Sequence, residues 1–182
     1  LKSLELKSNE YKILKNECLE VGIDFISTPY DYSDADILFD IGVDQFKVAS
    51  SQLTEIPFLE YIAKKGKPII LSTGMSNLSE VFESSQAILR INKKLTILQC
   101  TTNYPSLIED ANLEAMISIK NACKTSVGYS DHIQNNYACY AAVALGAEII
   151  EKHFTLDKSM NGPDHSSSLN PLEFNELVFG IR

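Results

Sequence analysis

Two histidine-containing segments in the second half of the chain have the residue types of a metal site. His132 ends the segment 128–132, and His153 lies in the segment 151–155. Each segment follows an apolar or β-branched run, at the point where a strand would pass into a loop. Side chains alternate along a strand, so Glu151 and His153 share one face while Lys152 points to the other. Because imidazole and carboxylate together suit Mn²⁺, Fe²⁺, Co²⁺ or Zn²⁺, the pattern predicts a divalent-metal site at neighbouring strand ends.

Strand-like apolar runs alternate with helical patterns along the whole sequence. The predicted strands cover residues 24–28, 45–49, 68–72, 95–100, 125–129 and 147–153. This alternation is typical of a parallel sheet with right-handed helical crossovers. Three helices have clear N-cap residues, namely Ser8, Asn77 and Asn170. The last helix also has Pro171 in its first turn and Glu173 placed for a capping box.

The positions of the polar residues distinguish two architectures for such a sheet. An open doubly wound sheet collects its site at one switch point, often with a glycine-rich phosphate loop, and the sequence has no such loop. Instead, polar residues follow almost every predicted strand, which is typical of the mouth of a (β/α)₈ TIM barrel. The sequence therefore favours an α/β fold of the TIM-barrel type.

Six strands are two fewer than a closed barrel needs. The helix that opens the chain would follow an absent second strand, so residues 1–182 are expected to form a partial TIM-barrel catalytic domain covering about strands 3 to 8. A six-strand arc cannot close and leaves unpaired edges. We therefore expect the chain to be an internal fragment of a longer protein, and to be inactive by itself.

Composition excludes several classes of protein. The chain has 182 residues, 45% of them hydrophobic, which is enough for one domain with a sizeable core. A net charge of −8 argues against a nucleic-acid or anionic-membrane partner. The sequence contains neither an apolar run of membrane-spanning length nor a signal-peptide pattern. The four cysteines have no C-x-x-C spacing, so we expect reduced, mostly buried thiols and a cytoplasmic protein.

Six short motifs stand in a characteristic order and spacing. They are Phe-Lys-Val-Ala-Ser at 46–50, Ile-Leu-Ser-Thr-Gly-Met at 70–75, Cys-Thr-Thr-Asn-Tyr-Pro at 100–105, Ser-Asp-His at 130–132, Glu-Lys-His-Phe-Thr at 151–155 and Gly-Pro-Asp-His at 162–165. The set resembles the N-acetylneuraminate (sialic acid) synthase family, which includes the legionaminate, pseudaminate and spore-coat polysaccharide synthases. The resemblance extends from residues 25–29 to the last predicted helix.

The resemblance implies a specific reaction and a set of site residues. Family members join phosphoenolpyruvate to an N-acetylmannosamine-like aldose, giving a nine-carbon 2-keto sugar acid and phosphate. By match to the family motifs, His132 and His153 would bind the metal, most often Mn²⁺, with Mg²⁺ or Co²⁺ as alternatives. The residues that would hold phosphoenolpyruvate are Thr28, Lys47, Ser50, Ser72 and Ser130. Tyr104 and Asp164 would contact the acceptor, an N-acylated hexosamine. The full-length protein is expected to be a homodimer with a C-terminal antifreeze-like domain.

These residue types suit the chemistry. Phosphoenolpyruvate carries about three negative charges, and a lysine with several hydroxyls is a natural cradle for them. The metal would polarise the aldehyde of the acceptor. We expect Glu151 to be the catalytic residue that positions or deprotonates the water added to the enol-ether carbon.

Two alternatives to this function remain open. Lys47 could form a Schiff base in an aldolase on a similar barrel, or the chain could be a truncated, non-catalytic barrel that acts as a binding module. His165 is interpreted as a loop residue. Gln52 and Thr102 depart from the common family pattern near the acceptor, so the identity of the sugar stays open.

Overall fold

Five parallel strands form one curled sheet in the computed structural model, which describes residues 6–182. The strands are β1 (Phe46–Val48), β2 (Ile69–Ser72), β3 (Leu95–Cys100), β4 (Ser126–Asp131) and β5 (Ile150–Lys152). They lie in the order β1-β2-β3-β4-β5, so each strand pairs with the next one along the chain. Because every connection returns to the same end of the sheet, all carboxyl ends meet at one edge.

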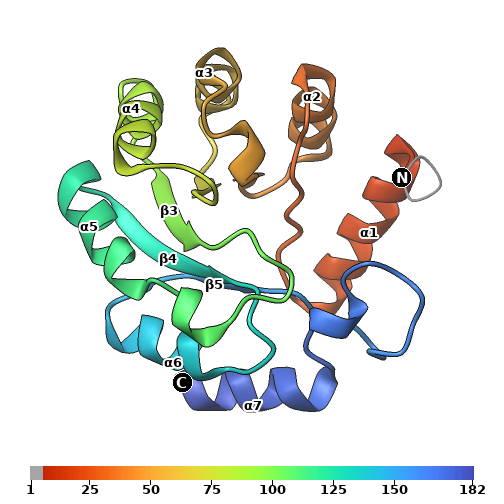
Figure 1. The fold of residues 1–182 in the computed structure, drawn as a ribbon. Helices are drawn as coiled ribbons and strands as arrows, with labels where there is room; N and C mark the ends of the chain where they lie inside the picture. Colours follow the sequence, from red (N-terminus) through yellow and green to blue (C-terminus); the bar gives the residue numbers. More distant parts are fainter. Residues whose placement is uncertain (1–5) are drawn as a thin grey trace.

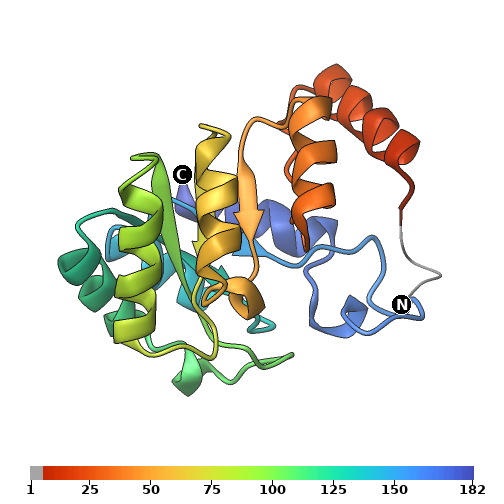
Figure 2. The same cartoon turned by 90° about the horizontal axis from the view of Figure 1, so that it is seen from above.

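Helices cover the convex side of this sheet, as Figure 1 and the perpendicular view in Figure 2 show. The α-helices are α1 (Ser8–Val21), α2 (Tyr32–Ile41), α3 (Ile56–Lys64), α4 (Leu78–Leu89), α5 (Leu113–Cys123), α6 (Tyr137–Ala144) and α7 (Pro171–Ile181). Short 3₁₀ turns are η2 (Ser50–Gln52), η3 (Ile108–Asp110) and η4 (His165–Ser167). All three turns lie in loops that follow strands, and these loops carry the predicted site residues Ser50, Tyr104 and Asp164.

The strand predictions were right for five of six segments. The predicted strand at 95–100 has the observed bounds, and that at 125–129 extends to Asp131. The predicted strand at 24–28 was wrong, because this segment makes only an isolated parallel bridge between Ser27 and Phe46. A strand needs a continuous ladder of backbone bonds, and β1 offers only three residues for pairing.

Helix ends agree with the sequence at two of three caps. The side chains of Asn77 and Asn170 accept bonds from the first-turn N–H groups of α4 and α7, and both helices have complete capping boxes. The prediction for Ser8 was wrong by one residue, since Lys7 is the N-cap of α1. Glu10 nevertheless accepts a bond from the Lys7 backbone N–H (2.5 Å), so a carboxylate still satisfies the start of this helix.

The two faces of the sheet differ in chemistry. Val48, Leu71, Ile97 and Val127 pair in register across four strands and are buried against the helices. Alternation sends the neighbouring side chains to the concave face, where charged and hydroxyl groups gather near the carboxyl edge. The apolar row therefore fixes the register that places the polar row.

The cysteines are free thiols, and three of the four are buried, as expected. Within residues 6–182, the structure contains no helix whose length and apolar character would allow it to cross a membrane.

Candidate active site

A chain of polar contacts crosses the concave face at the carboxyl ends of four strands. The Lys47 ammonium donates to Ser72 Oγ (2.8 Å) and lies 3.5 Å from Glu151 Oε2. Ser130 Oγ donates to the other carboxylate oxygen of Glu151 (2.7 Å), because β4 and β5 pair these two residues in register. Four of the predicted residues are thus brought into one hydrogen-bonded group.

Thr28 joins the same region of the molecule. A cavity of about 820 Å³ is lined by Thr28, Lys47 and Glu151, with apolar walls that include Ile70 and Leu177. The Ser27 bridge to β1 holds the segment that ends at Thr28 beside Lys47. Although the segment is not a strand, it delivers Thr28 to the predicted place.

The two predicted metal ligands lie side by side under an aromatic ring. The ring centroids of His132 and His153 are 5.3 Å apart. The Tyr104 ring lies 4.0 Å from His132 and 5.5 Å from His153, centroid to centroid. The imidazoles therefore converge from adjacent strand ends, although twenty-one residues separate them in the sequence (153 − 132 = 21).

The surroundings of His132 favour a neutral, oriented imidazole. Burial lowers the pKa of His132, nearby His153 lowers it further, and the bond to the Thr101 carbonyl opposes both. His132 Nδ1 lies 2.7 Å from the Thr101 carbonyl oxygen, so Nδ1 carries the proton and Nε2 keeps its lone pair. A backbone carbonyl behind one ring nitrogen is the usual support of a metal-binding histidine.

Within residues 6–182, the two imidazoles are the side chains that converge as donors for a metal. Among residues 6–182 the structure shows no group of three or more His, Cys, Asp or Glu side chains that could hold an ion. Glu151 accepts a bond from Ser130 and faces Lys47. Two convergent imidazoles fit a divalent transition metal whose other positions are taken by water or substrate.

Ser50 bonds to the loop after β2 and is not part of the hydrogen-bonded group around Lys47. Its hydroxyl accepts a bond from the Gly74 N–H (2.9 Å). A Cβ on Gly74 would lie 2.0 Å from Thr102 Oγ1, so only glycine fits between these two hydroxyls. Gln52, two residues after Ser50 in η2, is buried, and its Oε1 lacks a hydrogen-bond partner among the described residues. Gln52 and Thr102, which depart from the common family pattern, thus both lie close to Ser50.

Tyr104 and Asp164 lie near each other at the rim. Tyr104 is 48% exposed. Partial burial raises the pKa of Tyr104, and neighbouring Cys100, Asp164 and Glu151 raise it further. Asp164 is exposed and directly precedes η4, where its backbone carbonyl accepts bonds from Ser167 and Ser168. The Asp164 carboxylate is therefore available to a ligand.

His165, the third histidine, contacts its own loop. His165 Nδ1 and Thr155 Oγ1 are 2.8 Å apart, which ties the loop after β5 back to the strand end. The contact agrees with the interpretation of His165 as a loop residue.

One pair of residues beside the site was missed by the sequence reasoning. Asp131 and Lys152 form a buried ion pair, with Nζ and Oδ2 2.6 Å apart. Each directly precedes one of the predicted metal-binding histidines, and this adjacency is the signal that the sequence offered. Sequence alternation placed Lys152 on the outer face correctly but gave it no role.

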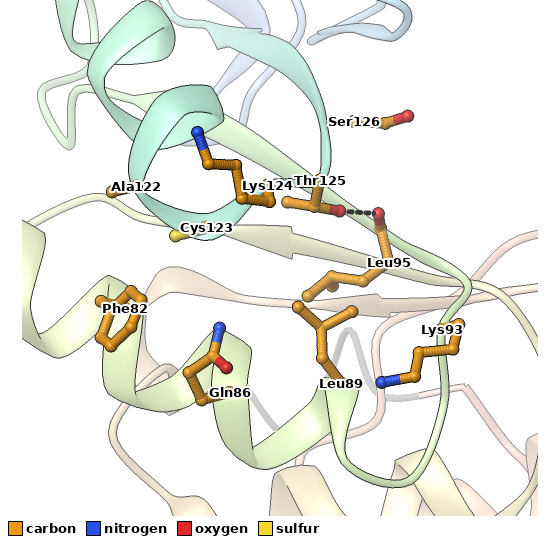
Figure 3. Close-up of a pocket in the computed structure, with 10 residues that line it drawn as sticks. All are labelled: Phe82, Gln86, Leu89, Lys93, Leu95, Ala122, Cys123, Lys124, Thr125 and Ser126. Atoms are coloured by element: carbon orange, nitrogen blue, oxygen red, sulfur yellow. Dashed lines mark hydrogen bonds between the residues drawn. The ribbon is translucent and has the colours of Figure 1, made fainter.

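A second cavity, shown in Figure 3, contains none of the predicted site residues. It has a volume of about 660 Å³ and lies at the amino-terminal edge of the sheet, between the ends of α4 and α5. Leu89, Leu95 and Phe82 supply apolar walls, with Lys93 at its edge. The bond from Thr125 Oγ1 to the Leu95 carbonyl (2.5 Å) joins the starts of β3 and β4 at this cavity.

A curled parallel sheet, helices outside and a polar group at the carboxyl ends of the strands define a TIM-barrel protein with its site at the barrel mouth. The sequence profile of the NeuB family matches residues 1–182, and the chain belongs to this family. An uncharacterized protein of Methanocaldococcus jannaschii is 49% identical over the whole chain, and the N,N'-diacetyllegionaminic acid synthase of Campylobacter jejuni is 46% identical. The chain spans 54% and 55% of these relatives, about half of their length.

Solved structures agree on the fold. The spore coat polysaccharide biosynthesis protein SpsE of Bacillus subtilis superposes with a TM-score of 0.94 at 38% identity, over 98% of this chain and 51% of that protein. A truncated 3-deoxy-D-arabino-heptulosonate 7-phosphate synthase of Thermotoga maritima superposes with a TM-score of 0.83 at 17% identity, over 96% of this chain and 70% of that protein. At this identity the similarity shows the fold alone. These likenesses confirm the predicted α/β barrel architecture and the predicted family.

Proposed function

We propose that this chain is the catalytic part of an enzyme that condenses phosphoenolpyruvate with an N-acetylmannosamine-like aldose, releasing phosphate and forming a nine-carbon 2-keto sugar acid. The observation that carries the proposal is the polar group on the concave face, where Lys47, Ser72, Ser130 and Glu151 meet beside two convergent imidazoles. Membership of the NeuB family and the synthase names of its relatives support it.

Lys47 and the hydroxyls supply the binding site for phosphoenolpyruvate. The Lys47 side chain is 12% exposed, and its ammonium already bonds to one hydroxyl and faces one carboxylate. The contact with Glu151 also joins two charged groups, but a phosphate that enters beside Thr28 and Ser72 carries more negative charge than one carboxylate and would compete with Glu151 for this ammonium. Binding of the substrate would thus release Glu151 from Lys47.

Glu151 then acts on water. The enol carbon of phosphoenolpyruvate forms a bond to the aldehyde carbon, and the aldehyde oxygen takes a proton from solvent to become a hydroxyl. The phosphate-bearing carbon, now positively charged, accepts the oxygen of a water molecule, and one proton of that water goes to Glu151. The C–O bond to phosphate then breaks as the ketone forms, the remaining water proton leaves with the phosphate, and Glu151 returns its proton to solvent. Ser130 holds Oε1 during these steps, so Oε2 is the oxygen that receives the proton.

His132 and His153 would hold a divalent cation, with Mn²⁺ as the leading choice and Mg²⁺ or Co²⁺ as alternatives. When bound, the cation supplies Lewis-acid polarisation of the acceptor aldehyde. Tyr104 lies over both imidazoles and, with Asp164, borders the space where the sugar would bind. The acceptor is proposed as an N-acylated hexosamine, and the residues around Ser50 would set its identity.

The Schiff-base alternative gains no specific support. The neighbours of the Lys47 ammonium are a hydroxyl, a backbone carbonyl and a carboxylate, which are acceptors that bind an ammonium. The free thiols support the expected cytoplasmic location. The homodimer stays a prediction, as does the inactivity of this segment by itself.

The test measures phosphate release by the full-length protein from phosphoenolpyruvate and N-acetylmannosamine with Mn²⁺. Glu151→Gln should lower kcat by about 10²–10⁴, and EDTA should abolish the reaction. Glu148→Gln is the matched control, since Glu148 lies just before the start of β5, away from the site, and its carboxylate accepts a bond from the Ser126 hydroxyl (2.9 Å). Activity that survives EDTA, or equal effects of the two substitutions, would contradict the proposal.

A further inference from the structure

A buried ion pair joins β4 to β5 on the face opposite the site. Asp131 and Lys152 are register partners, and Lys152 Nζ lies 2.6 Å from Asp131 Oδ2. The two side chains are 0% and 2% exposed, respectively. A buried pair of this kind persists only where further hydrogen bonds satisfy both ions, because desolvation of the charges is costly.

Every donor of the Lys152 ammonium is used. Besides Asp131, the ammonium donates to the backbone carbonyls of Ile133 and Asn135, the latter at 3.0 Å. An ammonium has three protons and therefore no further bond to make. Lys152 thus holds the end of β4 and the loop after it through three contacts, at Asp131, Ile133 and Asn135.

The Asp131 carboxylate is equally well satisfied. Its Oδ1 accepts bonds from the Tyr129 hydroxyl and the Ile133 N–H, both at 3.1 Å. Its Oδ2 also accepts from Cys139 Sγ (3.1 Å) in α6. The pair is therefore the centre of a network that includes two strands, one helix and one loop.

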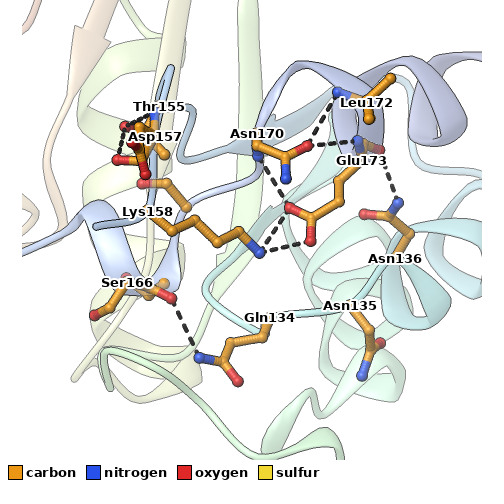
Figure 4. A network of polar contacts seen from close by, with 12 residues as sticks. Gln134, Asn135, Asn136, Thr155, Asp157, Lys158, Ser166, Asn170, Leu172 and Glu173 are labelled. Carbon is orange, nitrogen blue, oxygen red and sulfur yellow. Dashed lines mark hydrogen bonds and ion pairs between the residues drawn. The ribbon is translucent and has the colours of Figure 1, made fainter. Parts of the chain in front are cut away.

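The network continues to the loop that carries Asp164. Gln134 donates to the Ser166 carbonyl (3.2 Å) and Asn136 to the Glu173 carbonyl (3.1 Å), as Figure 4 shows. Lys158 bonds the Glu173 side chain (2.6 Å) in the same view. The segment 133–136 that Lys152 anchors is thus also the support of the loop after β5.

We propose that Asp131 and Lys152 are positioning residues, whose ion pair sets the separation and direction of the His132 and His153 imidazoles. This inference rests on the metal site proposed above. The peptide bonds that link each member of the pair to its histidine are planar and stiff. Anchoring the two side chains on the outer face therefore restricts the backbone from which the two imidazoles project on the inner face.

The type of residue matters as well as its volume. An apolar pair would fill the same space but would leave the carbonyls of Ile133 and Asn135 without donors. The ion pair is also neutral as a whole, so it holds the ligands without adding net charge behind a bound cation. Loss of supporting contacts behind metal ligands typically lowers metal affinity 10–100-fold.

The experiment titrates Mn²⁺ into the full-length protein and follows free Mn²⁺ by electron paramagnetic resonance, without substrates. Lys152→Met should weaken Mn²⁺ binding about tenfold or more. Lys65→Met is the matched control, because Lys65 also pairs with an aspartate, Asp36, but between α2 and α3. The Mn²⁺ affinity of Lys65→Met should stay within about twofold of the wild-type affinity. Ile88→Ala, which removes a buried side chain of α4 from the core, controls for loss of stability alone.

The outcomes separate this inference from the proposed function. Wild-type Mn²⁺ affinity in folded Lys152→Met, or equal weakening in Ile88→Ala, would overturn the positioning role and leave the metal site intact. If Lys152→Met does not fold, Lys152→Arg keeps the charge but cannot aim one ammonium at three acceptors. It should still weaken binding, and unchanged affinity would overturn the inference. Failure of wild-type protein to bind Mn²⁺, or unchanged binding in His132→Ala, would remove the site itself and the inference with it.

Discussion

Gly128 is the position where one added methyl group should disturb the site most directly. It lies on the concave face of β4, between Leu98 and the segment that leads into β5. A Cβ there would be 2.4 Å from the Ile149 carbonyl oxygen and 2.6 Å from Leu98 Cδ2. Leu98 can change rotamer, but the Ile149 carbonyl is backbone and accepts a bond from the Tyr129 N–H (2.9 Å). In Gly128→Ala the strands must therefore separate.

The magnitude follows from these distances. Relaxing the contact to 3.0 Å requires a shift of about 0.6 Å (3.0 − 2.4 = 0.6) between β4 and β5. Overpacking of this kind costs about 1–3 kcal/mol, which exceeds the gain of about 0.4–1 kcal/mol from a less flexible unfolded chain. Each kcal/mol of net loss in the free energy of unfolding lowers Tm by about 2–4 °C in a domain of this size. The Ser130–Glu151 bond (2.7 Å) spans the same two strands and should lengthen with them.

Thermal unfolding and phosphate release by the full-length protein measure the two effects. The control is Val127→Ala, at the neighbouring residue on the opposite face, where a cavity against the helices lowers stability without moving β5. Gly128→Ala should lose more activity than Val127→Ala at equal loss of stability. A Tm of Gly128→Ala at or above the wild-type value would refute the steric reasoning. Equal activity losses would refute its link to the site.

Two further predictions concern charge and thiol chemistry. The hydrogen bond from Lys158 holds the pKa of Glu173 below its usual range, with a smaller effect from the Asn170 N–H. Because the folded-state pKa is depressed, the stabilisation is complete above the ordinary carboxyl pKa and is lost as pH falls through the depressed value. Lys158→Met should therefore lower the free energy of unfolding by up to about 1 kcal/mol at neutral pH and by less in acid. Urea titrations at the two pH values measure both losses. Equal losses at the two pH values would contradict this prediction. Burial raises the pKa of Cys123 and of Cys139, so a thiol reagent followed by peptide mass spectrometry should label the more accessible Cys18 first. Labelling of Cys139 as fast as Cys18 would be inconsistent with the buried environment.

Local signals predicted much of the fold. The run at 95–100 is long and apolar enough to mark a strand without its neighbours, and Asn170, Pro171 and Glu173 mark a helix start through their own side chains. The segment 24–28 also has a strand-like sequence, but it forms a single bridge between Ser27 and Phe46. The length of a strand depends on how much backbone the neighbouring strand offers for pairing. Ser8 failed as a cap for a related reason, since Lys7 and Glu10 satisfy the first turn without it.

The sequence by itself determined the order of strands and helices, the family motifs and the residue types at each strand end. Those properties depend on neighbours within a few positions, which alternation and helical periodicity record. Only the tertiary structure decided which of these side chains meet. Lys47 and Glu151 are 104 residues apart (151 − 47 = 104) and come within 3.5 Å because the sheet curls. The buried bond between Asp131 and Lys152 likewise exists only where β4 and β5 pair in register, since two charges can be buried only when each provides the other's solvation.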